Sequence, residues 1–106
     1  MSGDLLRMIL TNKSDLIVGK LYKHIASGVR LYKTQQDLED SYILLTPTVG
    51  SVWQNDIVVL IEIDDIKHPT LRNISKIHHA IYALKPNGIV GWCAVTLHHW
   101  ATADHE

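Results

Sequence analysis

Apolar and polar residues alternate over short stretches of this chain, a pattern typical of half-buried β-strands. The strongest case is the β-branched run Ile-Val-Val-Leu-Ile-Glu-Ile at residues 57–63, which turn-forming residues bound on both sides. Strict alternation would place Leu60 and Glu62 on one face and Ile61 and Ile63 on the other. The pattern therefore predicts a strand over residues 57–63 with two distinct faces.

Shorter segments complete the set of predicted strands. Residues 29–33 alternate cleanly, and residues 16–25 alternate approximately. Residues 74–84 fit a helix at their start, but their second half suits a strand. The first stretch, residues 1–15, fits either a short helix or an edge strand and ends in a cluster of turn formers.

The clearest turn of the chain is the Asn87-Gly88 pair, which lies between two apolar runs. Such a pair is the strongest short-range signal of a β-hairpin, and we expect a positive φ at both residues. Residues 89–100 would then form the return strand. The polar stretches 34–40 and 64–73 are expected to be loops.

These segments predict a mainly β fold in a single domain of 106 residues. Five or six short strands, with turns roughly every 8 to 12 residues, indicate a small barrel or sandwich and leave room for one short helix. We expect an N-terminal arm or added strands over residues 1–27, a barrel core over 28–100 and a polar tail over 101–106.

Composition narrows the classes of function. Apolar residues make up 46% of the chain, and the formal net charge is -1. Without a basic excess, the chain does not fit an electrostatic nucleic-acid binder. Cys93 is the only cysteine, so neither an internal disulfide nor a cysteine-built zinc site can form.

The sequence also bears on where the protein is made and whether it enters a membrane. The N-terminus has no basic segment leading into a long apolar one, so we expect no signal peptide. The longest apolar run, residues 57–61, is far too short to cross a bilayer. We therefore expect synthesis in the cytoplasm and no membrane partner.

Three segments resemble the small Src-homology-3-like β-barrels of bacteria and phages. They are Pro-Asn-Gly-Ile-Val-Gly-Trp at 86–92, Gly-Val-Arg-Leu-Tyr-Lys at 28–33, and the stretch Thr48–Ile63. The first looks like the closing hairpin of such a barrel, the second like its opening strand and the third like its central strands. Free-standing proteins of this length look phage-encoded, so the resemblance implies residence in the virion or the host cytoplasm.

Histidines are the first candidates for chemistry. They occur as two adjacent pairs, 78–79 and 98–99, and one member of each pair could share a face with the other. His78 and His98 are thus candidate metal ligands, with a carboxylate as the third. The more ordinary interpretation has one histidine of each pair inward and hydrogen-bonded, and it is favoured because no helical His-Glu-x-x-His motif is present.

Carboxylates and nucleophiles give little support to catalysis. Glu62, Asp64 and Asp65 cluster at the end of the best strand, where Glu62 and Asp64 would share a face, but a solvated strand end explains them equally well. Cys93 falls within a predicted strand and suits a buried apolar position. The chain has neither a nucleophile elbow nor a glycine-rich phosphate loop. We expect neither an enzyme nor a cofactor.

Aromatic residues outnumber what so small a barrel must bury, with three tryptophans and four tyrosines. Exposed Trp and Tyr are common at binding hot spots, and we take Trp53, Trp100 and Tyr32 as candidate binding residues. Trp92, which follows Gly91, is interpreted as an architectural plug.

The leading hypothesis is a non-catalytic binding or assembly protein, either a virion component or a self-associating subunit. Its partner would be another protein or a second copy of the chain. Two alternatives stay open. One is a phage counter-defence module that sequesters a small molecule or a host factor. The other is a metal-dependent hydrolase that uses the histidine pairs.

Overall fold

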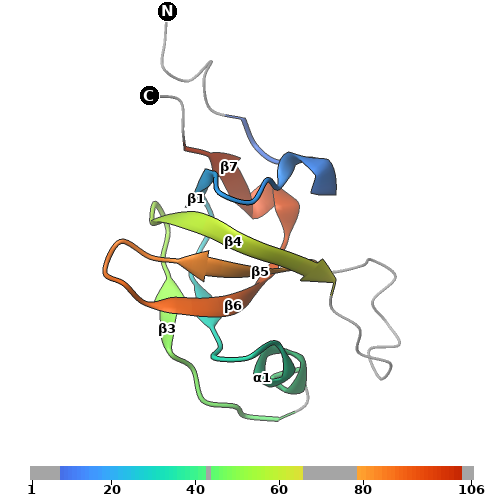
Figure 1. Cartoon of the computed structure of the whole chain (residues 1–106), viewed down its shortest axis with the longest axis vertical. Helices are drawn as coiled ribbons and strands as arrows, with labels where there is room; N and C mark the ends of the chain where they lie inside the picture. The colour runs from blue at the N-terminus through green and yellow to red at the C-terminus, as the bar shows by residue number, and fades with distance from the viewer. Residues whose placement is uncertain (1–7, 43, 66–78, 104–106) are drawn as a thin grey trace, which may run out of the picture.

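The computed structural model describes residues 8–42, 44–65 and 79–103. This part of the chain is mainly β, as the sequence predicts, and Figure 1 shows its arrangement. Its strands are β1 (Leu21–His24), β2 (Val29–Leu31), β3 (Gly50–Val52), β4 (Ile57–Asp65), β5 (His79–Leu84), β6 (Val90–Val95) and β7 (Trp100–Thr102). Its helices are α1 (Gln35–Asp40) and the short 3₁₀ helices η2 (Lys13–Asp15) and η3 (Leu97–His99). In these ranges no helix is long and apolar enough to span a membrane.

The strands form two antiparallel sheets that meet at one point. The larger sheet has five strands in the order β6-β5-β4-β1-β7, and β2 pairs with β3 in a two-stranded sheet. Tyr32, just after β2, exchanges two backbone hydrogen bonds with Trp92 of β6, at 2.8 and 2.7 Å. β1 lies between β4 and β7, so part of the expected N-terminal segment is integral to the main sheet (Figure 1). Among the described strand pairs, none closes the large sheet into a ring.

β4 is the longest described strand and contains a β-bulge. The register with β5 shifts between Leu60 and Glu62, which leaves Ile61 as the extra residue. Leu60 is buried and Ile63 packs against the same core, whereas Glu62 is exposed. The strand over 57–63 is therefore confirmed, but the strict alternation is wrong beyond Leu60, because one extra residue reverses the faces.

The hairpin between β5 and β6 is confirmed, with a different turn geometry. Gly88 has a φ of +91° and its N–H donates to the carbonyl of Lys85 at 3.0 Å. Asn87 does not adopt a positive φ. Its side-chain Oδ1 instead accepts the N–H of Ile89 at 3.1 Å. The expected positive φ at Asn87 is wrong, because the turn needs only Gly88 in the left-handed region.

Residues 34–40 correct a second expectation, since a helix stands where a loop was predicted. The side chain of Thr34 caps α1 by accepting the N–H of Asp37 at 3.0 Å. Leu38 is the buried residue of the helix and belongs to a small cluster with Tyr32 and Ala80. One cap and one apolar anchor thus suffice to order this polar segment.

The predicted return strand over 89–100 is also corrected, because it is interrupted. β6 ends at Val95, the 3₁₀ helix η3 follows, and β7 begins at Trp100. β7 pairs with β1 and not with β5, so the interruption carries the chain across the sheet. The strand runs on to Thr102, and Ala101 within the expected polar tail is buried.

The main core fills the space between the large sheet and the β2–β3 ribbon. Its largest members are Trp100, Tyr22, Leu10, Leu31, Leu60 and Ile81. Cys93 also belongs to it, and complete burial raises the pKa of this thiol to about 12. The thiol is therefore a packing group and not a nucleophile, as the sequence suggests.

Candidate functional site

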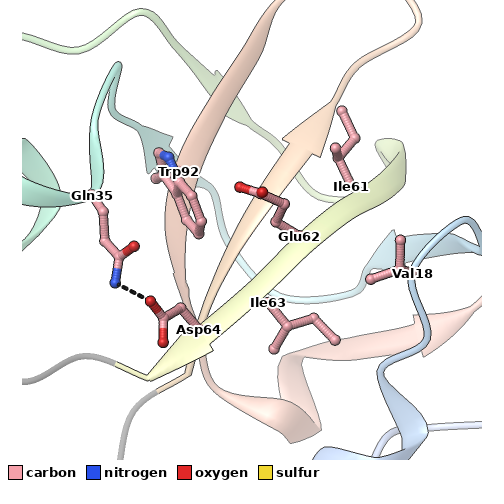
Figure 2. A pocket seen from close by; sticks show the side chains of 7 residues that line it. All are labelled: Val18, Gln35, Ile61, Glu62, Ile63, Asp64 and Trp92. Carbon is pink, nitrogen blue, oxygen red and sulfur yellow. Dashed lines mark hydrogen bonds between the residues drawn. The ribbon is translucent and has the colours of Figure 1, made fainter.

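A hollow of ≈ 370 Å³ follows the second half of β4, and Figure 2 shows it. Its lining residues are Val18, Gln35, Ile61, Glu62, Ile63, Asp64 and Trp92. The side chains of Gln35, Glu62, Asp64 and Trp92 lie on one side of the β4 ribbon together with Ile61, and those of Val18 and Ile63 lie on the other (Figure 2). The hollow thus has a polar, aromatic half and an aliphatic half.

Strand register brings Glu62 and Trp92 onto one face. Glu62 lies opposite Tyr82 in the β4–β5 pair, and Tyr82 lies opposite Trp92 in the β5–β6 pair. Residues directly opposite each other project from the same face of a sheet. The rings of Tyr82 and Trp92 are in contact, with centroids 5.2 Å apart and planes tilted by 39°. Trp92 therefore rests on a tyrosine and faces the hollow beside a carboxylate.

Gly91 fixes the backbone that carries Trp92. A Cβ atom at this position would lie 2.8 Å from Cβ of Leu31 and 3.1 Å from the carbonyl oxygen of Tyr32. Only a residue without a side chain lets the end of β2 come this close, which then allows the backbone pair between Tyr32 and Trp92. The Gly-Trp pair of the sequence thus serves the contact between the two sheets.

The two carboxylates of the hollow differ in their surroundings. Asp64 accepts a hydrogen bond from Nε2 of Gln35 at 2.9 Å and another from the N–H of Asp65 at 2.8 Å. The carboxylate of Glu62 makes no hydrogen bond or ion pair to any residue that the structure describes. One carboxylate is thus anchored to α1, and the other is open to a ligand.

Asp65, the third carboxylate of the predicted cluster, belongs to a separate group. Its Oδ1 lies 3.0 Å from Nδ1 of His79 and 3.0 Å from Nζ of Lys13. These contacts, with His79 first and Lys13 next, lower the pKa of the Asp65 carboxyl. The predicted cluster therefore divides: Glu62 and Asp64 line the hollow together, and Asp65 closes a contact with η2.

The three candidate binding residues from the sequence do not come together. Trp53 is 62% exposed and covers Gly28, where a Cβ atom would lie 2.5 Å from the indole. Trp100 is 1% exposed and lies in the main core, while Tyr32 is 9% exposed and lies in the small cluster with Leu38. Of the three, Trp53 alone presents its ring at the surface.

Sequence reasoning missed Trp92 as a site residue, although a signal was present. Once the hairpin is centred on Asn87-Gly88, counting outward from the turn places Trp92 opposite Tyr82. The second step, from Tyr82 to Glu62, could not be counted, because the bulge at Ile61 shifts the register of β4 by one residue. The site depends on an irregularity that alternation does not show.

The histidine pairs do not form a metal centre in the part of the chain that is described. His78 lies outside this part. His98 is exposed on η3, with its ring 4.5 Å from that of His99, and His79 is hydrogen-bonded to Asp65. Across residues 8–42, 44–65 and 79–103, no three His, Cys, Asp or Glu side chains gather as metal ligands would.

The chemistry of the hollow suits a cation. An indole face attracts an ammonium or guanidinium group, and a carboxylate without a partner adds a charge-assisted hydrogen bond. The lining residues that the structure describes include no hydroxyl, thiol or imidazole. No protein-family model, curated protein or solved structure matches this chain.

Proposed function

We propose that this protein is a non-catalytic binding module whose hollow holds a lysine or arginine side chain of a partner protein. The observation that carries the proposal is the Glu62 carboxylate, which has no partner among the described residues and shares the hollow with Trp92. Trp, Tyr and Arg are enriched among the residues that dominate binding energy at protein interfaces. None of the described lining residues is a nucleophile, which supports binding over reaction.

The geometry favours a cationic side chain over a neutral one. A cation over the ring of Trp92 gains about 0.5 to 2 kcal/mol. A charge-assisted hydrogen bond to Glu62 adds about 1.5 to 3 kcal/mol. Asp64 supplies a second negative charge, while its bond to Gln35 keeps it in position. Together these terms amount to about 2 to 5 kcal/mol, and the middle of this range corresponds to a dissociation constant on the order of millimolar for a single side chain. Further contacts of the partner would tighten it.

The wider predictions from the sequence are kept as part of this proposal. A Src-homology-3-like barrel is supported by the antiparallel sheet and by the hairpin at the position where the resemblance places it. Origin in a phage stays a prediction from the resemblance alone. Trp53, exposed and outside the hollow, is a second place where a partner could make contact.

Titration with single amino-acid derivatives tests the proposal. N-acetylarginine methylamide and N-acetyllysine methylamide are added to ¹⁵N-labelled protein, and the three indole N–H signals are followed by NMR. We expect the Trp92 signal to shift with millimolar affinity, while the Trp53 and Trp100 signals stay in place. Substitution of Trp92 and of Trp53 by Phe assigns the signals, and N-acetylnorleucine methylamide is the neutral comparison.

Two variants separate the hollow from general negative charge. Glu62→Gln removes the open carboxylate, and we expect affinity for the arginine derivative to fall about tenfold, as for one charge-assisted hydrogen bond. Asp40→Asn removes a carboxylate whose bond is to Gln36 on α1, and it should leave affinity unchanged. Equal loss in both variants, or equal shifts at Trp53 and Trp92, would contradict the proposal.

A further inference from the structure

We propose that the partner segment is extended and joins the large sheet as an added strand along the edge of β4, at Ile63. This inference rests on the proposed function, because the basic side chain of that strand is the one that enters the hollow. It adds a backbone contact to the side-chain contact. The two contacts can be tested apart.

The direction of the backbone groups of β4 follows from the hairpin. The N–H of Lys85 donates to the carbonyl of Ile89 at 2.9 Å, which makes these two a hydrogen-bonded pair. Such pairs alternate along antiparallel strands, so the backbone groups of Ile81 and Ala83 bond to β6, and those of Ala80, Tyr82 and Leu84 face β4. On β4, the backbone groups of Glu62 and Asp64 therefore face β5, and those of Ile63 face away from it.

On that far side, pairing with β1 stops before Ile63. The last bonds run from the N–H of Leu60 to Lys20, at 3.0 Å, and from the N–H of Gly19 to Leu60, at 2.7 Å. Gly19 has a φ of +93°, and the bulge follows at Ile61. No backbone group in the described ranges bonds to Ile63 from this side. Within the described ranges the edge at Ile63 is thus unpaired, and an unpaired edge is a template for a further strand.

The hollow itself lies along this edge. Its lining includes four consecutive residues of β4, numbers 61 to 64, whose side chains project to both faces of the strand. Figure 2 shows Val18 and Ile63 on one side of β4, and the carboxylates with Trp92 and Ile61 on the other. A hollow that touches both faces of one strand reaches around its edge. The hollow therefore offers space for the backbone of an incoming strand at this edge and, next to it, space for the side chains of that strand.

The charges of the edge select the occupant. A residue paired with Ile63 would place its side chain on the aliphatic face, and its two neighbours would face Glu62 and Asp64. A basic residue suits the position that faces Glu62, because this carboxylate has no partner among the described residues and none of the described lining residues carries a positive charge. A second copy paired through its own Ile63 would set Glu62 against Asp64, and like charges directly opposite each other are unfavourable. The occupant is therefore a basic, extended segment of another protein.

A short synthetic peptide provides the test. Acetyl-Thr-Arg-Val-Lys-Thr-amide places Val opposite Ile63 and a basic residue on each side of it. We expect it to bind about tenfold tighter than N-acetylarginine methylamide, since backbone bonds are added. The amide of Ile63 should shift, and its exchange with solvent should slow on binding. The same peptide with an N-methyl group on Val cannot donate to Ile63, and it should bind about tenfold more weakly than the parent.

The outcomes separate the two proposals. If the arginine derivative shifts Trp92 but the N-methyl peptide binds as well as the parent, the added strand is overturned and the hollow stands. If the parent peptide protects Ile63 while the arginine derivative leaves Trp92 unaffected, the strand stands and the hollow is overturned. Dimerisation seen by light scattering, with Ile63 protected in the absence of peptide, would overturn the basic partner in favour of a second copy.

Discussion

Trp92 and Trp100 lie only eight residues apart, but their surroundings are opposite. Trp100 is 1% exposed, and its ring meets that of His24 edge-on, with centroids 4.6 Å apart. Trp92 is half-buried, rests on Tyr82 and faces a hollow that also contains Glu62. Each indole thus lies near an ionisable side chain. We call Trp100 with His24, which are both buried, the sealed pair, and Trp92 with Glu62, which both line the hollow, the open pair. The sealed pair should govern stability, and the open pair should govern binding.

The largest expected effect comes from removing the sealed indole. Trp100→Ala leaves a cavity in the main core, and we expect the free energy of unfolding to fall by about 3 to 5 kcal/mol. Urea unfolding followed by circular dichroism measures the loss. Trp53→Ala is the matched control: because Trp53 is mostly exposed, we expect a loss below about 1 kcal/mol.

A small loss in Trp100→Ala would contradict the assignment of this residue to the core. A protein with an unfolding free energy of about 5 kcal/mol would not stay folded after the largest expected loss. Trp100→Phe then gives the comparison, since it keeps a ring and should lose less than the alanine variant.

The second effect tests the point where the two sheets meet. Gly91→Ala would bring a Cβ atom to 2.8 Å from Cβ of Leu31 and 2.9 Å from Cγ2 of Val49. Relief requires β2 to move, so we expect a loss of about 1 to 3 kcal/mol. Thermal unfolding measures it, and Gly50→Ala is the control, because its Cβ would lie 3.3 Å from the side chain of Ile89 alone. Equal stability of the two variants would show that the ribbon is not held by this contact.

The same contacts show how far the sequence predicts the fold. β-branched runs and the Asn87-Gly88 turn identify β4, β5 and the hairpin, because these signals are local. The helix α1 was missed because it depends on one cap, Thr34, and on burial of Leu38 against distant residues. A Thr-x-x-Asp pattern at the start of the segment, residues 34–37, was the available signal.

The candidate site was less predictable than the fold. Trp53, Trp100 and Tyr32 were chosen for residue type, and burial depends on contacts that residue type does not reveal. The core takes up Trp100 because η3 redirects the chain before β7. Glu62 joins Trp92 because the bulge in β4 reverses its face. Both events interrupt regular strands, and a prediction that assumes regular alternation of apolar and polar residues cannot include them.

The third effect concerns the ionisable group of the sealed pair. His24 is 2% exposed, and its Nδ1 has no hydrogen-bond partner among the described residues. Burial, and next the charge of His99, lower the pKa of His24 below its ordinary value of 6.5, against smaller opposite effects of Ala26 and Asp56. Below about pH 6.5 the unfolded chain therefore binds a proton that the folded protein resists.

Stability should consequently fall as the pH drops below about 6.5 and level off below the folded pKa of His24. The slope from one such group is at most about 1.4 kcal/mol per pH unit. Urea unfolding between pH 7.5 and pH 5 (about the range in which histidine titrates) measures it. His24→Gln should flatten the slope, and His98→Gln, an exposed histidine, should leave it unchanged. An unaltered slope in His24→Gln would contradict the role of burial.

The smallest effect is expected where the ionisable group is open. Glu62→Gln removes a charge that makes no contact in the described structure, so the free energy of unfolding should change by no more than about 0.5 kcal/mol. The same variant should lose affinity for the arginine derivative. Urea unfolding and the NMR titration, on one sample, measure both. A loss of stability above about 1 kcal/mol would mean that Glu62 supports the fold. Unchanged stability together with lost affinity for the arginine derivative would instead show that the Glu62 carboxylate serves the ligand and not the fold. This side chain lies open beside Trp92, so it gains its contacts only when a ligand binds.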